Sequence, residues 1–500
     1  MDLPVAIESR RPTAGTGTPD WVKHAVFYQI FPDRFAKSDR LPKPGNLEPW
    51  NSDPTAHGYK GGDLLGVVEH LDYLQDLGVT ALYFNPIFQS TANHRYHTHD
   101  YFRVDPLLGG DEALEELLDA CHRRDIRVVL DGVFNHASRG FFQFNDVLEN
   151  GAASPWLDWF TFKGFPANAY DHHRPPDYEA WFKLHALPKL NTDNPQVREY
   201  LMRVGEYWIR RGIDGWRLDV PEEIRTPGFW QEFRQRVKAI NPNAYIVGEI
   251  WHEAREWLQG DQFDGVMNYL FTGPAIAFSG RDHVVKEAVV GRSYAPWPGI
   301  DAPNYAAKVD RVLGLYPWEI QLTQLNLLDS HDTSRFLSIA GGDLTSVKLG
   351  ALLMFTFPGA PCIYYGDEIG MTGVLPAPWV RQSFPWDPPE TWDHDLLHFY
   401  KSLIALRRSR EALRTGDYTR LYAEGDVYAC ARSLGDARLV VVVNTAEEAR
   451  EALVPLPRLA ARRVSEIFST GDAPCIQVDG SRLRLTMPPR SGAVLDAPAG

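Results

Sequence analysis

Short apolar runs alternate along the chain, from Trp21 onward, with longer stretches of helical period. The short runs are rich in β-branched and aromatic residues, whereas the stretches between them repeat apolar residues every three or four positions, as β/α units do. The candidate strands are 25–30, 80–84, 126–130, 213–218, 245–248, 265–268, 325–328 and 362–365. The candidate helices are 64–77, 111–124, 195–211, 229–240, 344–357 and 396–408.

Eight strands joined by crossover helices favour a closed parallel barrel. We therefore predict an α/β fold with a (β/α)₈ TIM barrel over residues 21–136 and 190–410. Residues 137–189, after the third strand, show no clear period and predict an inserted lobe. Residues 411–500 carry short alternating runs separated by Gly, Asp and Pro, which predict a C-terminal antiparallel β-sandwich domain. Residues 1–20 are expected to be a flexible N-terminal segment.

The composition excludes several classes of protein. Hydrophobic residues make up 44% of the 500 residues and charged residues 23%, which fits a folded globular chain. A formal charge of −14 argues against a nucleic-acid partner, because phosphate binding needs clustered cations. No apolar run is long enough to predict a membrane span, and no secretory signal is visible, so we expect a cytoplasmic protein. The four Cys show no metal-binding spacing and are expected to be free thiols.

Polar side chains gather at or just past five of the predicted strand ends. A single carboxylate there could simply cap the next helix, but five such segments converge on the edge where barrel enzymes keep their reactive groups. The segments are Asp131-Gly-Val-Phe-Asn-His136, Gly215-Trp-Arg-Leu-Asp219, Gly248-Glu249-Ile-Trp251, Asp329-Ser-His-Asp332 and Tyr365-Gly-Asp-Glu368.

Two of these segments supply carboxyls in different surroundings. Asp219 follows Arg217 by two residues, so strand alternation sends both side chains to the barrel interior. The guanidinium should keep Asp219 ionised, which suits a nucleophile. Glu249 follows the apolar run 245–248 and adjoins Trp251, surroundings that should raise its pKa and suit a general acid. A glycosidic bond is cleaved with retention by such a pair, about 5–5.5 Å apart.

These segments, in this order, resemble the α-amylase superfamily, glycoside hydrolase family 13. The resemblance implies that Asp219 is the nucleophile, Glu249 the acid/base and Asp332 the stabiliser of the transition state. It further implies that the cleaved sugar is bound by side chains that we expect to include Tyr96, His136, Arg217, His331 and Trp251. The motifs Leu187-Pro-Lys-Leu-Asn191 and Glu249-Ile-Trp-His-Glu-Ala254 are similar to the neopullulanase, cyclomaltodextrinase and maltogenic amylase branch.

The resemblance implies a retaining hydrolase of α-1,4 bonds, and of α-1,6 bonds in some cases, in maltooligosaccharides, cyclodextrins or pullulan. No cofactor is needed for that chemistry, and the loop 33–53 lacks the compact oxygen cluster that a structural Ca²⁺ needs, so no metal ligand is predicted. Members of the branch usually carry an N-terminal β domain that shapes a dimer. Only about twenty residues precede this barrel, so a monomer or weak homo-oligomer is expected.

Two other functions stay open on the sequence alone. A glucan transglycosylase would use the same site with a sugar, rather than water, as the acceptor. A non-catalytic barrel that binds or scaffolds carbohydrate would be a different class of protein. The presence of all three carboxylates disfavours the second alternative.

Overall fold

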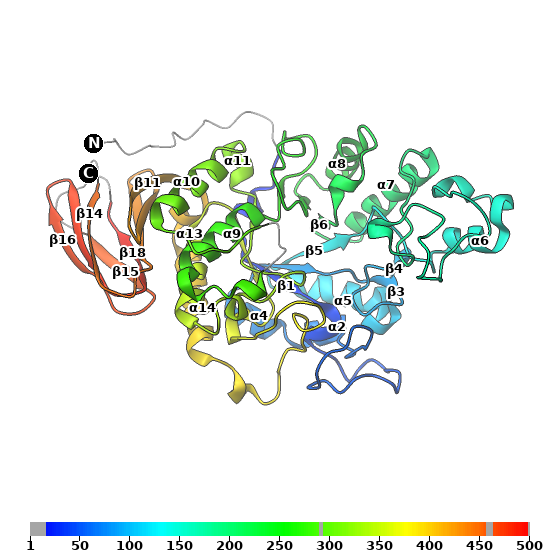
Figure 1. Cartoon of the computed structure of the whole chain (residues 1–500), viewed down its shortest axis with the longest axis horizontal. Coiled ribbons are helices and arrows are strands. Elements are labelled where there is room, and N and C mark those ends of the chain that lie inside the picture. The colour runs from blue at the N-terminus through cyan, green and yellow to red at the C-terminus, as the bar shows by residue number, and fades with distance from the viewer. Residues whose placement is uncertain (1–16, 290–293, 457–463, 499–500) are drawn as a thin grey trace.

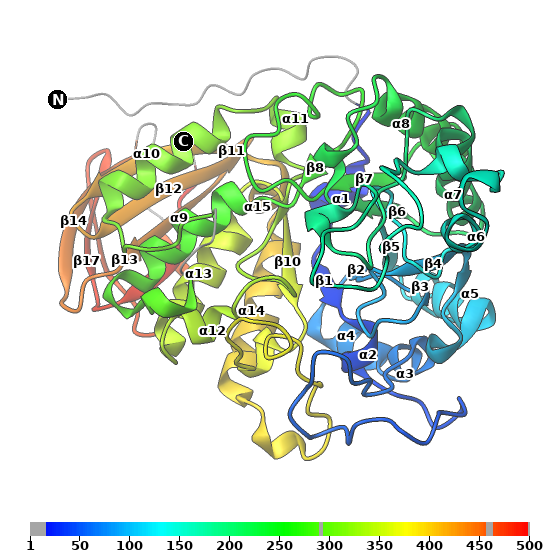
Figure 2. The same cartoon turned by 45° about the vertical axis from the view of Figure 1, so that its right-hand side comes forward.

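The computed structural model describes residues 17–289, 294–456 and 464–498. Of the segment predicted to be flexible, residues 1–16 lie outside this part of the chain, and α1 (Asp20–His24) begins at its end. The C-terminal sheets lie at one end of the molecule and helix α6 (Phe142–Asn150) at the other, with the barrel between them (Figures 1 and 2). Within the described residues, no helix has both the length and the apolar character needed to cross a membrane.

The predicted barrel is confirmed, with every candidate strand in place. The sheet runs in the order β8-β7-β6-β5-β2-β1-β10-β9 with all neighbours parallel, and a parallel bridge from Met267 to Leu325 joins its two edges. The strands are β1 (Phe27–Ile30), β2 (Ala81–Phe84), β5 (Arg127–Gly132), β6 (Gly215–Leu218), β7 (Tyr245–Gly248), β8 (Gly265–Val266), β9 (Leu325–Asn326) and β10 (Ala360–Tyr364).

Helices pack around the barrel and bury apolar residues against the strands and against one another. They are α2 (Pro32–Phe35), α3 (Leu64–Glu69), α4 (Leu71–Leu77), α5 (Gly110–His122), α7 (Pro195–Arg210), α8 (Phe229–Ile240), α9 (Tyr269–Gly280), α10 (Ala302–Leu313), α11 (Trp318–Gln321), α12 (Phe336–Ile339), α13 (Leu344–Thr356), α14 (His394–Ser409) and α15 (Glu411–Thr415).

The helix predicted over 64–77 is two helices that meet at His70. His70 has φ −113° and ψ 12°, and its ring Nδ1 lies 2.7 Å from the carbonyl oxygen of Gly66, so the helical hydrogen-bond ladder stops there. The His70 ring packs on Trp386 with 3.8 Å between centroids. Gly78 caps the end of the second helix with a φ of 97°, which favours a residue without Cβ.

The segment 137–189 contains α6 and short 3₁₀ turns, although its sequence shows no clear helical period. Phe144 and Val147 bury one side of α6 among aromatic rings, so an aromatic-rich neighbourhood hides a short amphipathic helix. A bridge between His136 and Lys189 brings the two ends of the segment together, and a bridge between Ala180 and Pro188 lies within it. A two-stranded sheet of β3 (Phe88–Ser90) and β4 (Thr98–Val104) lies in the preceding connection.

The predicted C-terminal antiparallel sheets are present. One sheet has the order β11-β12-β13-β18-β15 and the other β14-β17-β16, with an apolar core between them. Their strands are β11 (Asp417–Glu424), β12 (Val427–Leu434), β13 (Ala437–Asn444), β14 (Arg450–Pro455), β15 (Ser465–Ser469), β16 (Cys475–Asp479), β17 (Arg482–Met487) and β18 (Ser491–Asp496). The domain boundaries stated above stay predictions. The four Cys are free thiols, as expected, and three of them are buried.

Candidate active site

The predicted carboxyls meet in one cavity at the carboxyl ends of the strands. Asp219 follows β6 and Glu249 follows β7, and their backbone amides donate to the Gly132 and Leu218 carbonyls at 3.1 and 2.9 Å, which extends the ladder by one residue. Asp332 comes from the loop after β9. The cavity has a volume of about 560 Å³ and is lined by His94, Tyr96, His97, His136, Trp181, Phe182, Leu184, Leu187, Asp219, Val220, Glu222, Glu223, Glu249, Trp251, Asp332, Leu375, Ala377 and Arg381.

Arg217 is the central cation of this site. Its Nη1 lies 2.9 Å from both oxygens of Asp131 and 3.0 Å from Oδ1 of Asp219. Its Nη2 lies 2.8 Å from Oε2 of Glu249, a close ion pair whose angle does not make a hydrogen bond. The side chain is fully buried, beneath the cavity rather than on its wall. One buried cation thus serves three carboxyls.

The pKa shifts of Glu249 and Asp219 only partly follow the expectation from the sequence. Burial raises the pKa of Glu249 to about 7, with Arg217 opposing and Asp332 adding to the rise, as predicted. Burial also raises the pKa of Asp219, because Arg217 offsets only part of the effect of burial and of the charges on Glu249 and Asp131. The expectation that Arg217 alone keeps Asp219 ionised was therefore too simple. The two carboxyls titrate as a pair that holds a proton.

Asp332 has different partners. Its Oδ2 lies 3.0 Å from His331 Nε2, and its Oδ1 accepts a hydrogen bond of 2.9 Å from Arg381 Nη2. Burial opposes its ionisation, but His331 and Arg381 outweigh burial and hold the pKa well below its usual range. Asp332 is therefore an anion, while burial lowers the pKa of His331 and favours a neutral ring.

Of the remaining predicted binding residues, Tyr96, His136 and Trp251 line the cavity, whereas His331 is almost fully buried and does not line it. Tyr96 lies parallel to His331, with 5.5 Å between centroids. His136 stacks on Trp181 at 5.3 Å, and its buried Nε2 has no hydrogen-bond partner within the described part of the chain, so it is available to a hydroxyl in the cavity. Trp251 stacks on Tyr269 at 3.6 Å and donates from Nε1 to Oε1 of Glu249 at 3.2 Å.

Sequence reasoning missed Arg381. It lies in the connection after β10, where no periodic pattern marks a functional position, and it donates to Asp332 and, through Nε, to the His331 carbonyl at 3.0 Å. The lining residues Trp181 and Phe182 were also missed, although the aromatic richness of 137–189 was a usable signal.

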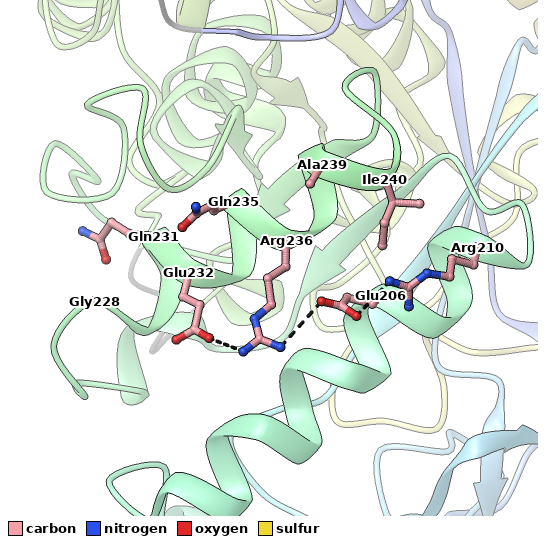
Figure 3. A pocket seen from close by; sticks show the side chains of 9 residues that line it. All are labelled: Glu206, Arg210, Gly228, Gln231, Glu232, Gln235, Arg236, Ala239 and Ile240. Atoms are coloured by element: carbon pink, nitrogen blue, oxygen red, sulfur yellow. Dashed lines mark ion pairs between the residues drawn. The ribbon is translucent and has the colours of Figure 1, made fainter.

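A second hollow of similar volume, about 580 Å³, lies between α7 and α8. Figure 3 shows that its charged side chains are paired with one another, Arg236 with Glu232 and Glu206, and Glu206 with Arg210. None of the residues described as lining it is aromatic or lies at a strand end. The cavity at the strand ends is the better candidate for chemistry.

A family model described as the alpha amylase catalytic domain matches residues 29–388. This chain belongs to the alpha-amylase family. The match covers most of the barrel together with the segment 137–189, so the predicted family is confirmed.

Relatives of known activity match over most of the chain. It is 44% identical to a cyclomaltodextrinase of Geobacillus thermopakistaniensis, covering 94% of this chain and 76% of the relative. It is 42% identical to neopullulanase 2 of Thermoactinomyces vulgaris, covering 96% and 78%. The structure is similar to the native form of the Nostoc punctiforme debranching enzyme, with a TM-score of 0.89, 56% identity and coverage of 96% and 99%.

Proposed function

We propose that this chain is a retaining α-glucan hydrolase that cleaves α-1,4 bonds, and α-1,6 bonds as well, in maltooligosaccharides, cyclodextrins or pullulan. One observation carries the proposal: Asp219, Glu249 and Asp332 line the same cavity, where Asp219 and Glu249 share Arg217 while Asp332 contacts His331 and Arg381. The relatives, which are named for cyclomaltodextrin, pullulan and branched substrates, support the substrate class.

In the first step, Glu249 donates its proton to the glycosidic oxygen as the bond to the anomeric carbon breaks. An oxygen of Asp219 forms a bond to that carbon, and the leaving sugar departs as an alcohol. A pKa of about 7 makes Glu249 a competent acid near neutrality. Because Asp219 and Glu249 contact neighbouring nitrogens of one guanidinium, they lie close together, which supports the retaining geometry.

In the second step, Glu249, now a carboxylate, takes a proton from water while the water oxygen attacks the anomeric carbon and releases Asp219. Both steps pass through an oxocarbenium-like transition state with positive charge on the sugar. Asp332, kept anionic by Arg381 and His331, is suited to stabilise that charge. Each residue thus returns to its starting protonation state.

The sugar contacts follow from the lining. Tyr96 and Trp251 offer aromatic faces, and Nε2 of His136 offers a polar contact for a sugar hydroxyl. Arg217 and His331 contact the reacting carboxyls and position them. Trp181 and Phe182, from the segment 137–189, add an apolar wall suited to further glucose units.

Hydrolysis of cyclodextrin, pullulan, starch and maltotriose, with products identified, tests the proposal. We expect shorter α-glucans whose new anomeric carbon first appears in the α configuration by NMR. Asp219→Asn, which keeps the size of the side chain, should abolish turnover and preserve sugar binding. Full activity of that variant would refute the role of Asp219. Products longer than maltotriose would instead favour the transglycosylase alternative.

We also propose that the enzyme is cytoplasmic, acts as a monomer or weak homo-oligomer, and binds an oligosaccharide rather than a nucleic acid. Free buried thiols suit a reducing compartment, and the charge of −14 disfavours polyanions. Light scattering and cell fractionation would test the assembly and the location.

The loop considered for Ca²⁺ contains Asp33. Its carboxylate accepts hydrogen bonds from Arg34 Nε at 2.8 Å and from the Lys60 backbone amide at 2.9 Å.

A further inference from the structure

Two buried amides, Gln29 and Asn85, connect the two halves of the site. Gln29 is the third residue of β1, Asn85 directly follows β2, and each side chain is almost fully buried. Neither lines the cavity. They lie between Tyr96 and His331. Tyr96 contacts Asp131, which is bonded to Arg217, and His331 contacts Asp332.

The ion pair between Arg217 and Asp131 sets which groups donate and which accept in this chain of hydrogen bonds. Asp131 has both oxygens on the Arg217 guanidinium, so it is an anion that can only accept. Tyr96 Oη lies 2.8 Å from Asp131 Oδ2 and therefore gives it the single phenolic proton. Toward its other neighbours, Asn85 Nδ2 at 3.0 Å and His331 Nε2 at 2.8 Å, the same oxygen can only accept.

This constraint propagates through the two amides. Because Asn85 turns its NH₂ group to Tyr96, its Oδ1 faces Gln29 Nε2, at 3.0 Å. Gln29 Nε2 also lies 2.9 Å from Nδ1 of His331. An amide nitrogen can only donate, so Nδ1 of His331 must carry a lone pair and the ring proton must be on Nε2. Nε2 of His331 therefore donates this proton to Tyr96 Oη at 2.8 Å, and Asp332 Oδ2 lies 3.0 Å from the same nitrogen.

We propose that Gln29, with Asn85, is a positioning residue that fixes His331 as the neutral Nε2–H tautomer and thereby holds the Asp332 carboxylate in place. In the opposite tautomer, the lone pair of His331 Nε2 would face the lone pairs of Asp332 Oδ2. The proton on His331 Nδ1 would face the NH₂ group of Gln29. An imidazolium would satisfy Asp332 but still oppose the Gln29 NH₂ group. The inference extends the proposed function, because it assigns a reason for the geometry of Asp332.

Nitrogen-15 NMR of histidine-labelled enzyme tests the tautomer directly. The His331 signals are assigned by their loss in His331→Asn. We expect an unprotonated Nδ1 and a protonated Nε2 near neutral pH, and a protonated Nδ1 would overturn the inference. This measurement does not depend on turnover. A protein that hydrolyses no glucan and yet shows this tautomer would sink the proposed function and leave the inference standing.

Two substitutions of Gln29 separate positioning from simple filling of space. Gln29→Glu keeps the shape but can only accept, so it demands a proton on Nδ1, whereas Gln29→Met merely removes the hydrogen bonds. We expect Gln29→Glu to lower kcat by about ten-fold or more at similar KM, to protonate Nδ1, and to be more damaging than Gln29→Met. If Gln29→Glu is as active as Gln29→Met or more so, the inference is wrong.

A matched control accounts for the cost of a buried carboxyl. Gln321 is also fully buried, and its Nε2 donates to the Val312 carbonyl at 2.6 Å, away from the cavity. Gln321→Glu should lower Tm but leave kcat and the His331 tautomer unchanged. A similar loss of kcat in Gln321→Glu would attribute the effect of Gln29→Glu to destabilisation and overturn the proposal.

Discussion

Arg217 lies between Asp131, Asp219 and Glu249, and this sharing decides how the reacting carboxyls titrate. A cation that pairs with one carboxylate alone would keep the pKa of that carboxylate low. Here the same guanidinium also serves Asp131, so burial prevails at Asp219 and Glu249. The pair therefore retains a proton at a pH where exposed carboxyls are ionised, as acid catalysis requires.

The pH dependence of kcat/KM should show this proton. Because the pKa of Glu249 is raised to about 7, the acid form is present below that value and is lost as the pH rises through it. We expect kcat/KM for maltotriose to fall about ten-fold per pH unit on the alkaline side. Glu249→Gln should remove this limb and should impair maltotriose cleavage far more than cleavage of a nitrophenyl glycoside, whose leaving group needs no proton. An alkaline limb that persists in Glu249→Gln would contradict the assignment.

Arg381 offers a second test. Removing it in Arg381→Ala leaves Asp332 with His331 alone and frees the loop that carries both residues. We expect kcat to fall by roughly ten- to a hundred-fold, since hydrogen bonds to charged groups contribute about 1.5–3 kcal/mol, with a smaller change in KM. Arg381→Lys should recover part of the loss because it keeps the charge. Exposed Arg103→Ala is the control, and equal effects of the two alanine variants would rule out a specific role.

The three carboxyls could be predicted because each follows an apolar strand or stands in a recognisable segment. Arg381 could not, because a connection without regular structure gives no period to read. Gln29 left a weaker signal: it is a polar residue in the otherwise apolar strand Phe27–Ile30, buried on every residue. Such a residue inside a parallel barrel needs a buried partner, and the sequence does not reveal which one.

The strands were predicted to within a few residues because strands of a parallel barrel are buried on both faces and read as continuous apolar runs. The split at His70 was missed because apolar positions on both sides keep the same helical spacing, while the break depends on tertiary contacts with Trp386. The turn after β6 was also not foreseen. Val220 there has a φ of 36° and a ψ of 53°, a left-handed conformation that β-branched residues strongly avoid.

The strain at Val220 leads to a stability prediction. Asn tolerates the left-handed region better than Val, so Val220→Asn should relieve about 1 kcal/mol and raise Tm slightly. It should also lower activity, because Val220 lines the cavity and its amide approaches Oε2 of Glu249 at 3.4 Å. Calorimetry and kinetics check both effects. Val285→Asn, at a part-exposed residue with an ordinary φ of −76°, is the control and should not raise Tm.

The barrel and the C-terminal sheets are joined by strands whose side chains enter two cores. In β13, Val440 and Val442 belong to the core between the C-terminal sheets, whereas Leu439, Val441 and Val443 belong to the barrel core. Strand alternation sends successive side chains to opposite faces, so an uninterrupted apolar run is what a strand between two cores requires. Unfolding of the C-terminal sheets therefore exposes the flank of the barrel.

Two buried guanidiniums lie at the same junction, and neither has a carboxylate partner among the described residues. Arg432, from β12, donates to the Thr356 carbonyl at 2.6 Å and to the Leu413 carbonyl at 2.9 Å, and Arg407 donates to Leu413 at 3.0 Å and to Phe355 at 2.9 Å. They cover carbonyls at the C-terminal end of α13, where a helix leaves acceptors unpaired and a positive charge is favoured. Burial lowers the pKa of Arg432 to about 10, so this charge is costly and its hydrogen bonds must compensate.

Arg432→Met should therefore destabilise the whole molecule rather than one end. It removes the buried charge but leaves several carbonyls without donors, and each such group costs about 1–3 kcal/mol. We expect a net loss of about 2–3 kcal/mol, a smaller loss in Arg432→Lys, and kinetic constants close to those of the parent below Tm, since Arg432 does not line the cavity. Calorimetry should show one transition shifted to lower temperature. The control is Arg484→Met, at a half-exposed arginine of β17, which should leave Tm unchanged. A separate early transition in Arg432→Met would contradict the prediction, because it would mean that the C-terminal sheets unfold independently of the barrel.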